Sequence, residues 1–241
     1  MHEPRYNATT WSRHQGMCHV ITWSGGSGGV VRILTFASQK GGSGKTSLAV
    51  STAVAAAEDG ETVVAIDTDP QKSLSAWGKR RQAQSVRVET VEPSQVRSVI
   101  SGLRKAGDTS LVIVDTPGFF GAGVALALQD ADFVLVPVKP SILDVEAARP
   151  TVEQLQTLRK TFGLVLNQCL SSSQGRTLDA ATALVRSGTL APYMVALRAD
   201  FLDSMTAGLG VTEIAPKGKA ATEIRLLWAW LKARLVEVSD G

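Results

Sequence analysis

The sequence predicts an α/β fold, a doubly wound, mostly parallel sheet flanked by helices on both faces. Short runs rich in Val, Ile and Leu alternate along the chain with longer segments of helical periodicity. Several runs are continuously apolar, as expected for strands that helices cover on both sides. Alternation of this kind requires right-handed crossovers, which keep successive strands parallel. With 241 residues, 44% of them hydrophobic, the chain is long enough to bury such a sheet.

The strands are expected where Val, Ile and Leu cluster. The first run is VVRILTFA, and it is followed by TVVAID, VRVETV, SLVIVD, DFVLVPV, FGLVLNQ and YMVAL. These runs occupy residues 30–37, 62–67, 86–91, 110–115, 132–138, 162–168 and 193–197. Ligands bind at the carboxyl ends of strands in sheets of this kind. The polar residues that end these runs are therefore expected to converge on one site.

The helices are expected between these strands and after the last of them. The first is rich in Ala, Leu and Val and follows a glycine-rich turn. The last has a single apolar stripe, which predicts a helix packed on the core rather than one lying on a membrane. The expected helices are 45–58, 71–83, 94–106, 121–130, 141–160, 176–187 and 219–236.

Residues 1–29 are expected to form a disordered tail, or to reflect an over-extended start, ahead of a domain spanning residues 30–241. The segment ends in SGGSGG, which has the composition of a flexible linker, and it contains no apolar run typical of a secretion signal. It holds all three histidines of the chain: His2, His14 and His19. The predicted domain therefore lacks the commonest general base.

Composition and charge narrow the class of protein only slightly. The formal net charge of +3 allows a basic surface without requiring one. The two cysteines, Cys18 and Cys169, lie far apart and have no metal-ligand spacing, which is typical of reduced thiols in a reducing compartment. No apolar run approaches the roughly 18–20 residues of a membrane span. A cytoplasmic protein is expected.

The segment KGGSGKT, residues 40–46, predicts a phosphate-binding loop, because an apolar strand precedes it and a helix begins in it. Glycines allow backbone N–H groups to surround phosphate oxygens, and the helix N-terminus adds the positive end of its dipole. Lys45 is expected to reach the β- and γ-phosphates, and the Thr46 hydroxyl to coordinate Mg²⁺. The loop departs from GxxxxGK[ST], since Gln39 stands at the first glycine position. The residues expected to contact nucleotide here are Lys40, Gly41, Gly42, Ser43, Gly44, Lys45, Thr46 and Ser47.

A second nucleotide motif is LVIVDTPG, residues 111–118. Asp115 ends its apolar run and is expected to hold Mg²⁺ through a water molecule, which is the Walker B arrangement. Gly118 can donate its backbone N–H to the γ-phosphate. DTPG also matches the DxxG of GTPases, but the chain has no NKxD, so guanine recognition is disfavoured.

Four segments together resemble the ParA/MinD family of ATPases, and among its members the small plasmid-type (ParF-like) ParA proteins. They are the variant loop KGGSGKT, DTDPQKSLSAW (67–77), VLVPVKPSILDV (134–145) and IAPKGKAATEI (214–224). The resemblance covers residues 32–236. It implies a P-loop NTPase fold and Mg²⁺-dependent hydrolysis of ATP to ADP and phosphate.

The resemblance also implies roles for single residues. Lys40 is expected to reach across an ATP-dependent homodimer to the nucleotide of the other subunit, with an ion pair to an acid of its own chain as the alternative. Asp69 is expected to orient the attacking water, while Asp67 supports the Mg²⁺ site from behind; the alternative for either acid is a structural capping role at the strand end. Asn167 is expected to contact adenine, or else to be a turn residue. Phosphoryl transfer needs positioning more than a strong base, so slow turnover is compatible with a domain that lacks histidine.

Partners are implied in the same way. Basic residues in the C-terminal part are expected to hold nucleoid DNA without sequence preference, unless they are ordinary surface charges. The protein partner is expected to be a ParB-like centromere-binding protein or a small ribbon-helix-helix protein, and no membrane is expected to bind. The expected location is then cytoplasmic and nucleoid-associated. The expected DNA contacts are Arg198, Lys217, Lys219 and Arg225.

These expectations lead to one leading function and two rivals. The leading function is plasmid or chromosome segregation by an ATPase whose dimer binds DNA and releases it on partner-stimulated hydrolysis. The first rival is a positioning or assembly ATPase of the same family, serving conjugation, secretion or cell-division placement. The second is a kinase or metal-dependent synthetase on the same scaffold, such as the dethiobiotin synthetase relatives, but the sequence shows no motif for a small-molecule acceptor.

Overall fold

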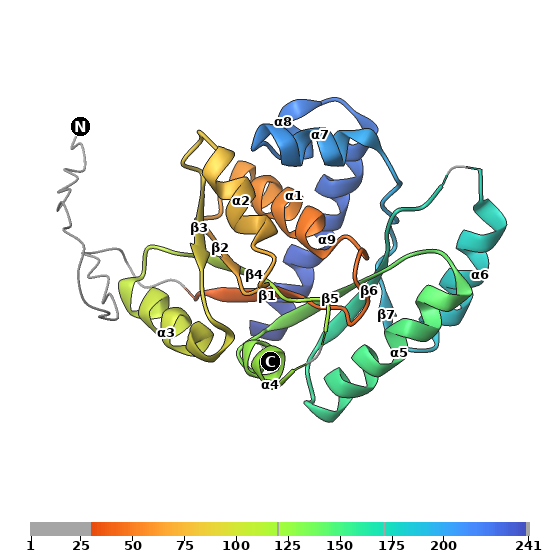
Figure 1. Cartoon of the computed structure of the whole chain (residues 1–241), viewed down its shortest axis with the longest axis horizontal. Coiled ribbons are helices and arrows are strands. Elements are labelled where there is room, and N and C mark those ends of the chain that lie inside the picture. Colours follow the sequence, from red (N-terminus) through yellow and green to blue (C-terminus); the bar gives the residue numbers. More distant parts are fainter. Residues whose placement is uncertain (1–29, 120, 171, 240–241) are drawn as a thin grey trace.

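The structure of the protein is a computed structural model that describes residues 30–119, 121–170 and 172–239. Residues 1–29, for which the sequence predicts a tail, lie outside the described residues. The described chain forms a parallel sheet of seven strands in the order β3-β2-β4-β1-β5-β6-β7 (Figure 1). The predicted α/β class and parallel sheet are confirmed. The strands are β1 (Arg32–Phe36), β2 (Val63–Asp67), β3 (Val86–Thr90), β4 (Leu111–Asp115), β5 (Phe133–Val138), β6 (Phe162–Leu166) and β7 (Thr189–Leu190).

Helices cover both faces of this sheet (Figure 1). One face carries α1, α2, α7, α8 and α9, and the other carries α3, α4, α5 and α6. A short 3₁₀ turn, Pro93–Gln95, leads into α3. The helices are α1 (Lys45–Glu58), α2 (Ser73–Arg80), α3 (Val96–Ala106), α4 (Ala122–Gln129), α5 (Ile142–Thr157), α6 (Gln174–Val185), α7 (Ala199–Ala207), α8 (Val211–Ile214) and α9 (Lys219–Ser239).

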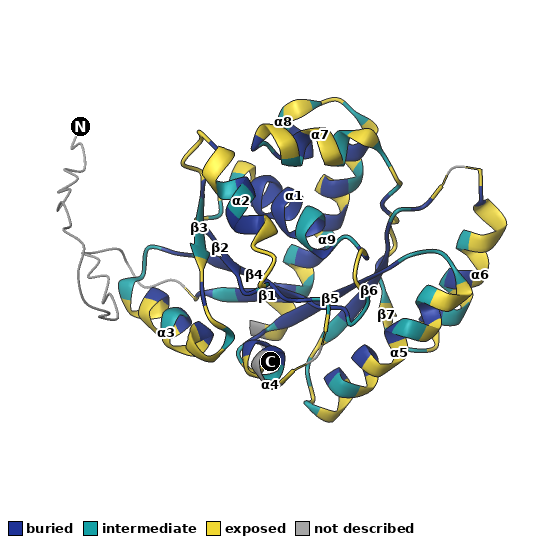
Figure 2. Ribbon diagram, in the orientation of Figure 1, coloured by how far each residue is buried: buried dark blue, intermediate teal, exposed yellow. Residues whose placement is uncertain are grey.

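Burial on both faces explains why the strands read as continuous apolar runs rather than alternating ones. In β1, Leu34 and Phe36 pack in the core under α1 and α9, whereas the neighbouring Ile33 packs under α3. The central strands are buried, while the helices expose their outer faces (Figure 2). The apolar stripe of the last helix is buried in the first of these cores, as predicted: Ile224, Leu227, Trp228, Leu231 and Leu235. Within the described residues, no helix has both the length and the apolarity needed to cross a bilayer.

The prediction of a last strand at 193–197 is wrong. The last strand is β7, and the 193–197 segment forms an isolated bridge between Ala196 and Cys169. Beyond β7, the N–H groups of Ala191 and Val195 donate to the successive acceptors Leu164 and Leu166, so residues 192–194 loop out and no continuous ladder forms. Helices α7 and α8 are absent from the predicted elements, since they are only nine and four residues long and their apolar contacts come from distant segments. The other boundaries agree within a few residues, and α1 spans 45–58 as predicted.

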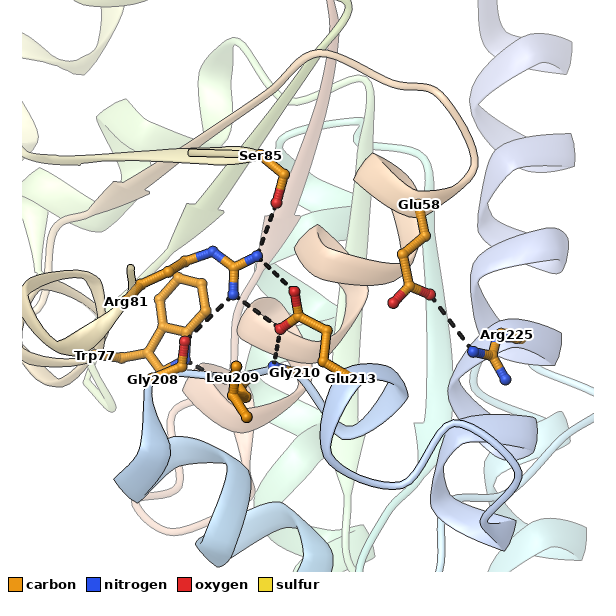
Figure 3. A network of polar contacts seen from close by, with 9 residues as sticks. All are labelled: Glu58, Trp77, Arg81, Ser85, Gly208, Leu209, Gly210, Glu213 and Arg225. Carbon is orange, nitrogen blue, oxygen red and sulfur yellow. Dashed lines mark hydrogen bonds and ion pairs between the residues drawn. The ribbon is translucent and has the colours of Figure 1, made fainter. Parts of the chain in front are cut away.

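An ion pair with a buried arginine fastens the end of α2 to α8 and to the turn that precedes α8 (Figure 3). Arg81, which follows α2, donates to both carboxylate oxygens of Glu213 at 2.9 and 2.8 Å, and to the carbonyl of Gly208 at 3.2 Å. Its guanidinium lies 5.0 Å from the ring centroid of Trp77, a cation–π distance. The indole N–H of Trp77 donates to the carbonyl of Leu209 at 3.0 Å. The carboxyl end of α2 is thus fixed to the α7–α8 segment.

Replacing Glu213 with glutamine is expected to lower the free energy of unfolding by about 2 kcal/mol. The reason is that the Arg81 side chain, which is 2% exposed, would lose its counter-ion. Urea unfolding measures the difference. Glu237→Gln is the matched control, because the ion pair of Glu237 with Arg234 is exposed; a change below about 0.5 kcal/mol is expected there. Equal losses in both variants would contradict a structural role for the buried pair.

The difference in stability between wild type and Glu213→Gln is expected to depend on pH. Partial burial alone would raise the pKa of Glu213, but the bonds from Arg81 and from the Gly210 N–H lower it below the ordinary glutamate value of 4.5. Because the pKa is lower in the folded protein, the carboxylate stabilises the fold above the ordinary pKa and loses this effect as the pH falls through the lowered value. The stability difference between wild type and Glu213→Gln should therefore shrink below pH 4.5.

Candidate functional site

The predicted site residues gather at the carboxyl ends of β1, β4 and β2, which are neighbours in the sheet. A cavity of about 440 Å³ opens there. Its walls are the loop between β1 and α1, residues 69–71 after β2, and Gly118 and Phe119 after β4. The sheet therefore brings together the segments that the sequence places at the ends of separate strands.

Two glycines of the loop before α1 have left-handed backbones, with φ of +73° at Gly42 and +89° at Gly44. A Cβ at Gly44 would lie 2.3 Å from the side-chain nitrogen of Asn167. This amide donates to the Ser43 carbonyl at 2.8 Å, and Gln168 donates to the Gly42 carbonyl at 3.1 Å. The segment after β6 thus fixes the phosphate loop. Contact of Asn167 with adenine stays a prediction. Gln168 also holds the loop, and no sequence motif indicates this role.

Lys45 is the first residue of α1 and is 7% exposed. Burial lowers the pKa of its ammonium group, while the charges of Asp115 and Asp69 act in the opposite direction. A Cβ at Gly118 would lie 3.6 Å from the Lys45 Nζ, so this nitrogen lies close to the segment after β4. A largely desolvated cation at the cavity wall fits an anionic ligand such as a phosphate group.

Thr46 and Asp115 form a contact that fits the predicted metal site. The Thr46 hydroxyl donates to Oδ2 of Asp115 at 2.6 Å. Burial raises the pKa of Asp115 to about 7, although the bond from Thr46 opposes the shift. Its other oxygen, Oδ1, is buried with no hydrogen-bond partner among the described residues. A buried carboxylate with one unsatisfied oxygen beside a hydroxyl fits a hard cation such as Mg²⁺, which prefers oxygen ligands.

The two acids after β2 have different surroundings. Asp67 is fully buried, and its carboxylate accepts from the Asp69 N–H at 3.1 Å and from the N–H and hydroxyl of Ser75 at 2.7 and 2.8 Å. Both of its oxygens therefore hold the chain between β2 and α2. Asp69 lines the cavity, and its carboxylate accepts a hydrogen bond from the Gln71 N–H at 2.9 Å. The geometry makes Asp67 a positioning residue for this loop. Its support of a Mg²⁺ site stays a prediction.

Lys40 lies beside the cavity and is absent from its walls. Its Nζ is 2.6 Å from Oδ1 of Asp144, in the first turn of α5. The structure thus shows the alternative arrangement, an ion pair within one chain. The sequence does not indicate Asp144 as the partner of Lys40, because these residues are more than a hundred positions apart.

The residues predicted to contact DNA do not form one free basic patch. Arg198 pairs with Glu223 at 2.5 Å, and Arg225 lies 3.5 Å from Glu58. Lys217 and Lys219 are exposed, and neither has an ion-pair partner in the described part of the chain. Of the four residues predicted to contact DNA, only the two lysines present charge to solvent without an ion-pair partner among the described residues.

Comparison with known proteins places this geometry in a family. A model of the CobQ/CobB/MinD/ParA nucleotide binding domain matches residues 34–204. The maintenance of carboxysome distribution protein A of Gloeobacter kilaueensis is 31% identical over 201 residues, which cover 83% of this chain and 91% of that protein. A probable plasmid-partitioning protein ParA of Thermus thermophilus is 29% identical over 167 residues, which cover 54% of this chain and 52% of that protein.

The fold also recurs among solved structures. The septum site-determining protein MinD of Pyrococcus horikoshii, complexed with Mg-ADP, superposes with a TM-score of 0.71 over 84% of this chain and 96% of its own, at 18% identity. The phosphate loop, Asp69, Asp115 and Asn167 all lie within the matched residues 34–204. Sequence, sheet order and the residues around the cavity agree, and the chain belongs to the ParA/MinD family of nucleotide-binding ATPases.

Proposed function

We propose that this protein is a partitioning ATPase that segregates a plasmid or chromosome. ATP closes a homodimer, the dimer binds DNA without sequence preference, and a ParB-like or ribbon-helix-helix partner stimulates hydrolysis and release. The observation that carries the proposal is the separation of two lysines. Lys45 forms part of the cavity wall, whereas Lys40 lies outside that wall on the same loop. A lysine in this place is available to a second subunit's phosphates.

The cavity residues have separate proposed roles in hydrolysis. The loop from Gly41 to Thr46 holds the phosphates, and Asp69, which also lines the cavity, orients the attacking water. Gly118 offers its backbone N–H to the terminal phosphate. Mg²⁺, held at Thr46 and Asp115, would neutralise phosphate charge during transfer.

Exposed apolar side chains around the cavity support a face that a second subunit covers. Phe119 lines the cavity and is 60% exposed, and Ile142 and Leu143 at the start of α5 are 65% and 68% exposed. Asp144, the partner of Lys40, follows them in the same turn. Exposed apolar side chains at the cavity wall and next to the partner of Lys40 are compatible with an interaction surface.

A second candidate function is supported by the similarity to the carboxysome distribution protein A, which extends over most of both chains. In this alternative, the same ATPase positions a protein body rather than a DNA molecule. The plasmid-partitioning relative is matched over about half of its length, 52%. The two candidates share the nucleotide-dependent dimer and the DNA surface and differ in the cargo and its adaptor protein.

Light scattering of the full chain with Mg²⁺ and either ADP or ATP tests the shared mechanism. The molar mass is expected to double with ATP and to stay monomeric with ADP, and a non-specific DNA duplex is expected to bind only the ATP form. A monomer in both nucleotides would contradict the proposed function. Pull-down of the chain with the adaptor encoded beside it then separates the two cargos.

DNA binding is expected to depend on the two free lysines more than on Arg198. Because Lys217 and Lys219 have no acidic partner, the double variant Lys217→Glu/Lys219→Glu should weaken DNA binding by at least about tenfold and reduce its salt slope by about two. Fluorescence anisotropy at several salt concentrations measures both. Lys105→Glu, on α3 at the opposite face, is the matched control. Unchanged affinity in the double variant would place the DNA surface elsewhere.

A further inference from the structure

The ion pair of Lys40 with Asp144 is held from the Asp144 side. Ser141 caps α5 by accepting from the Asp144 N–H at 3.1 Å, and its hydroxyl donates to the second carboxylate oxygen of Asp144. The Asp144 side chain is 13% exposed, whereas that of Lys40 is 40% exposed. The carboxylate is therefore the fixed member of the pair, and the lysine is the member that can leave.

A second lysine lies close to the start of α5 in the chain. Lys139 follows β5, and its Nζ would lie 3.7 Å from a Cβ at Gly42, so it reaches over the phosphate loop. Lys139 has no ion-pair partner within the described residues. Partial burial alone would raise the pKa of Asp144, but its bonds to Lys40 and Ser141 and the charges of Lys40 and Lys139 lower it. Two cations thus act on one anchored acid, and of these two only Lys40 contacts it.

Departure of Lys40 would leave this acid without its direct partner. A partly buried carboxylate that loses its counter-ion is destabilised, so the pair opposes any rearrangement that takes Lys40 elsewhere. The Lys139 carbonyl accepts from the N–H of Ser141, the cap of α5, at 2.8 Å, and the Lys139 charge acts on Asp144. Lys139 is therefore placed to replace Lys40 through a side-chain movement. The replacement would keep the acid neutralised after Lys40 has left.

We propose that Asp144 holds Lys40 in its own subunit until a dimer forms, and that Lys139 takes over this carboxylate when Lys40 moves to the partner's nucleotide. The inference rests on the proposed function, since it requires Lys40 to act across a dimer. It assigns a positioning role to Asp144 and Lys139. The strength of the Lys40–Asp144 pair then influences the ATP concentration at which the dimer closes.

Asp144→Asn tests the holding role. The amide cannot form the ion pair, so the variant is expected to dimerise at an ATP concentration about two- to fivefold lower than wild type, the range expected for losing one partly exposed ion pair. Light scattering across an ATP titration measures this midpoint. The control is Asp130→Asn, because Asp130 pairs with Arg97 at 3.0 Å, far from the site, and has a similar side-chain exposure of 16%. An unchanged or higher midpoint for Asp144→Asn overturns the proposal.

Lys139→Gln tests the exchange separately. Without the second cation, Lys40 is harder to release, so the midpoint is expected to rise by about two- to fivefold. In the Asp144→Asn background the same change is expected to have no effect, because no acid is left to exchange. Equal effects of Lys139→Gln in both backgrounds overturn the exchange, and they would assign Lys139 to direct phosphate binding instead. Lys105→Gln is the control for the charge change.

Nucleotide affinity separates failure of this inference from failure of the proposed function. Binding of a fluorescent ADP analogue to the monomer is expected to be equal in wild type, Asp144→Asn and Lys139→Gln, which also shows that all three fold. If wild type stays monomeric with ATP, the proposed function fails and this inference fails with it. If wild type dimerises and the Asp144→Asn midpoint does not fall, only the inference fails.

Discussion

Replacing Lys45 with alanine is expected to abolish tight nucleotide binding. The Lys45 ammonium is 7% exposed and lies within the electrostatic reach of Asp115 and Asp69. Its loss would leave these two acids facing the phosphates with no buried cation between them. Removing one member of a desolvated charge pair costs about 2–5 kcal/mol, so the affinity for ATP should fall by at least about thirtyfold.

Titration calorimetry with Mg²⁺ and ATP measures this loss. Lys79→Ala on the exposed part of α2 is the control, because it removes one positive charge outside the cavity. A melting curve shows whether Lys45→Ala remains folded. Tight ATP binding by a folded Lys45→Ala protein would contradict the assignment of residues 40–46 as the phosphate loop.

Replacing Lys40 with alanine is expected to give a different defect. Because Lys40 does not line the cavity of its own subunit, the variant should bind ADP with nearly wild-type affinity. It should lose the ATP-dependent dimer and at least about a hundredfold in turnover, since a cation supplied from a partner subunit commonly contributes that much to phosphoryl transfer. Phosphate release and light scattering measure the two losses.

The pair of variants at Lys40 and Asp144 distinguishes two explanations of this defect. Both substitutions break the same 2.6 Å contact. If the contact itself were needed for activity, Asp144→Asn and Lys40→Ala would be equally inactive. If Lys40 acts on the other subunit, Asp144→Asn stays active while Lys40→Ala does not. Wild-type turnover by Lys40→Ala would contradict any function of this lysine across a dimer.

Much of the fold and the candidate site follows from local sequence. The first helix spans the predicted residues, because glycine ends the loop at Gly44 and an uninterrupted Ala- and Val-rich segment follows. Asp115 ends an apolar strand, and burial of that strand leaves its carboxylate among the buried polar residues of the site. These features depend on a few adjacent residues, so they can be predicted from the sequence.

Features that depend on distant contacts are not predictable in this way. The strand expected at 193–197 has the right composition and bonds to Leu166 and Cys169, but residues 192–194 loop out, so it does not continue the ladder of β7. The ion pairs of Lys40 and Arg198 join residues from separate elements, so neither pairing has a sequence signal. For Asp67 the sequence leaves both a metal-site role and a capping role open, and only the structure shows the three hydrogen bonds by which it holds the loop that leads to α2.

Helix α2 is anchored at both of its ends, and this limits how the molecule can move. Near its start, Ser75 is bonded to Asp67. At its end, Arg80 donates to the Met205 carbonyl at 3.0 and 3.2 Å, and Arg81 pairs with Glu213. An eight-residue helix that is anchored at both ends is a rigid connection rather than a hinge. Any displacement of the segment after β2 must therefore either carry the α7–α8 corner with it or break one of these two anchorages.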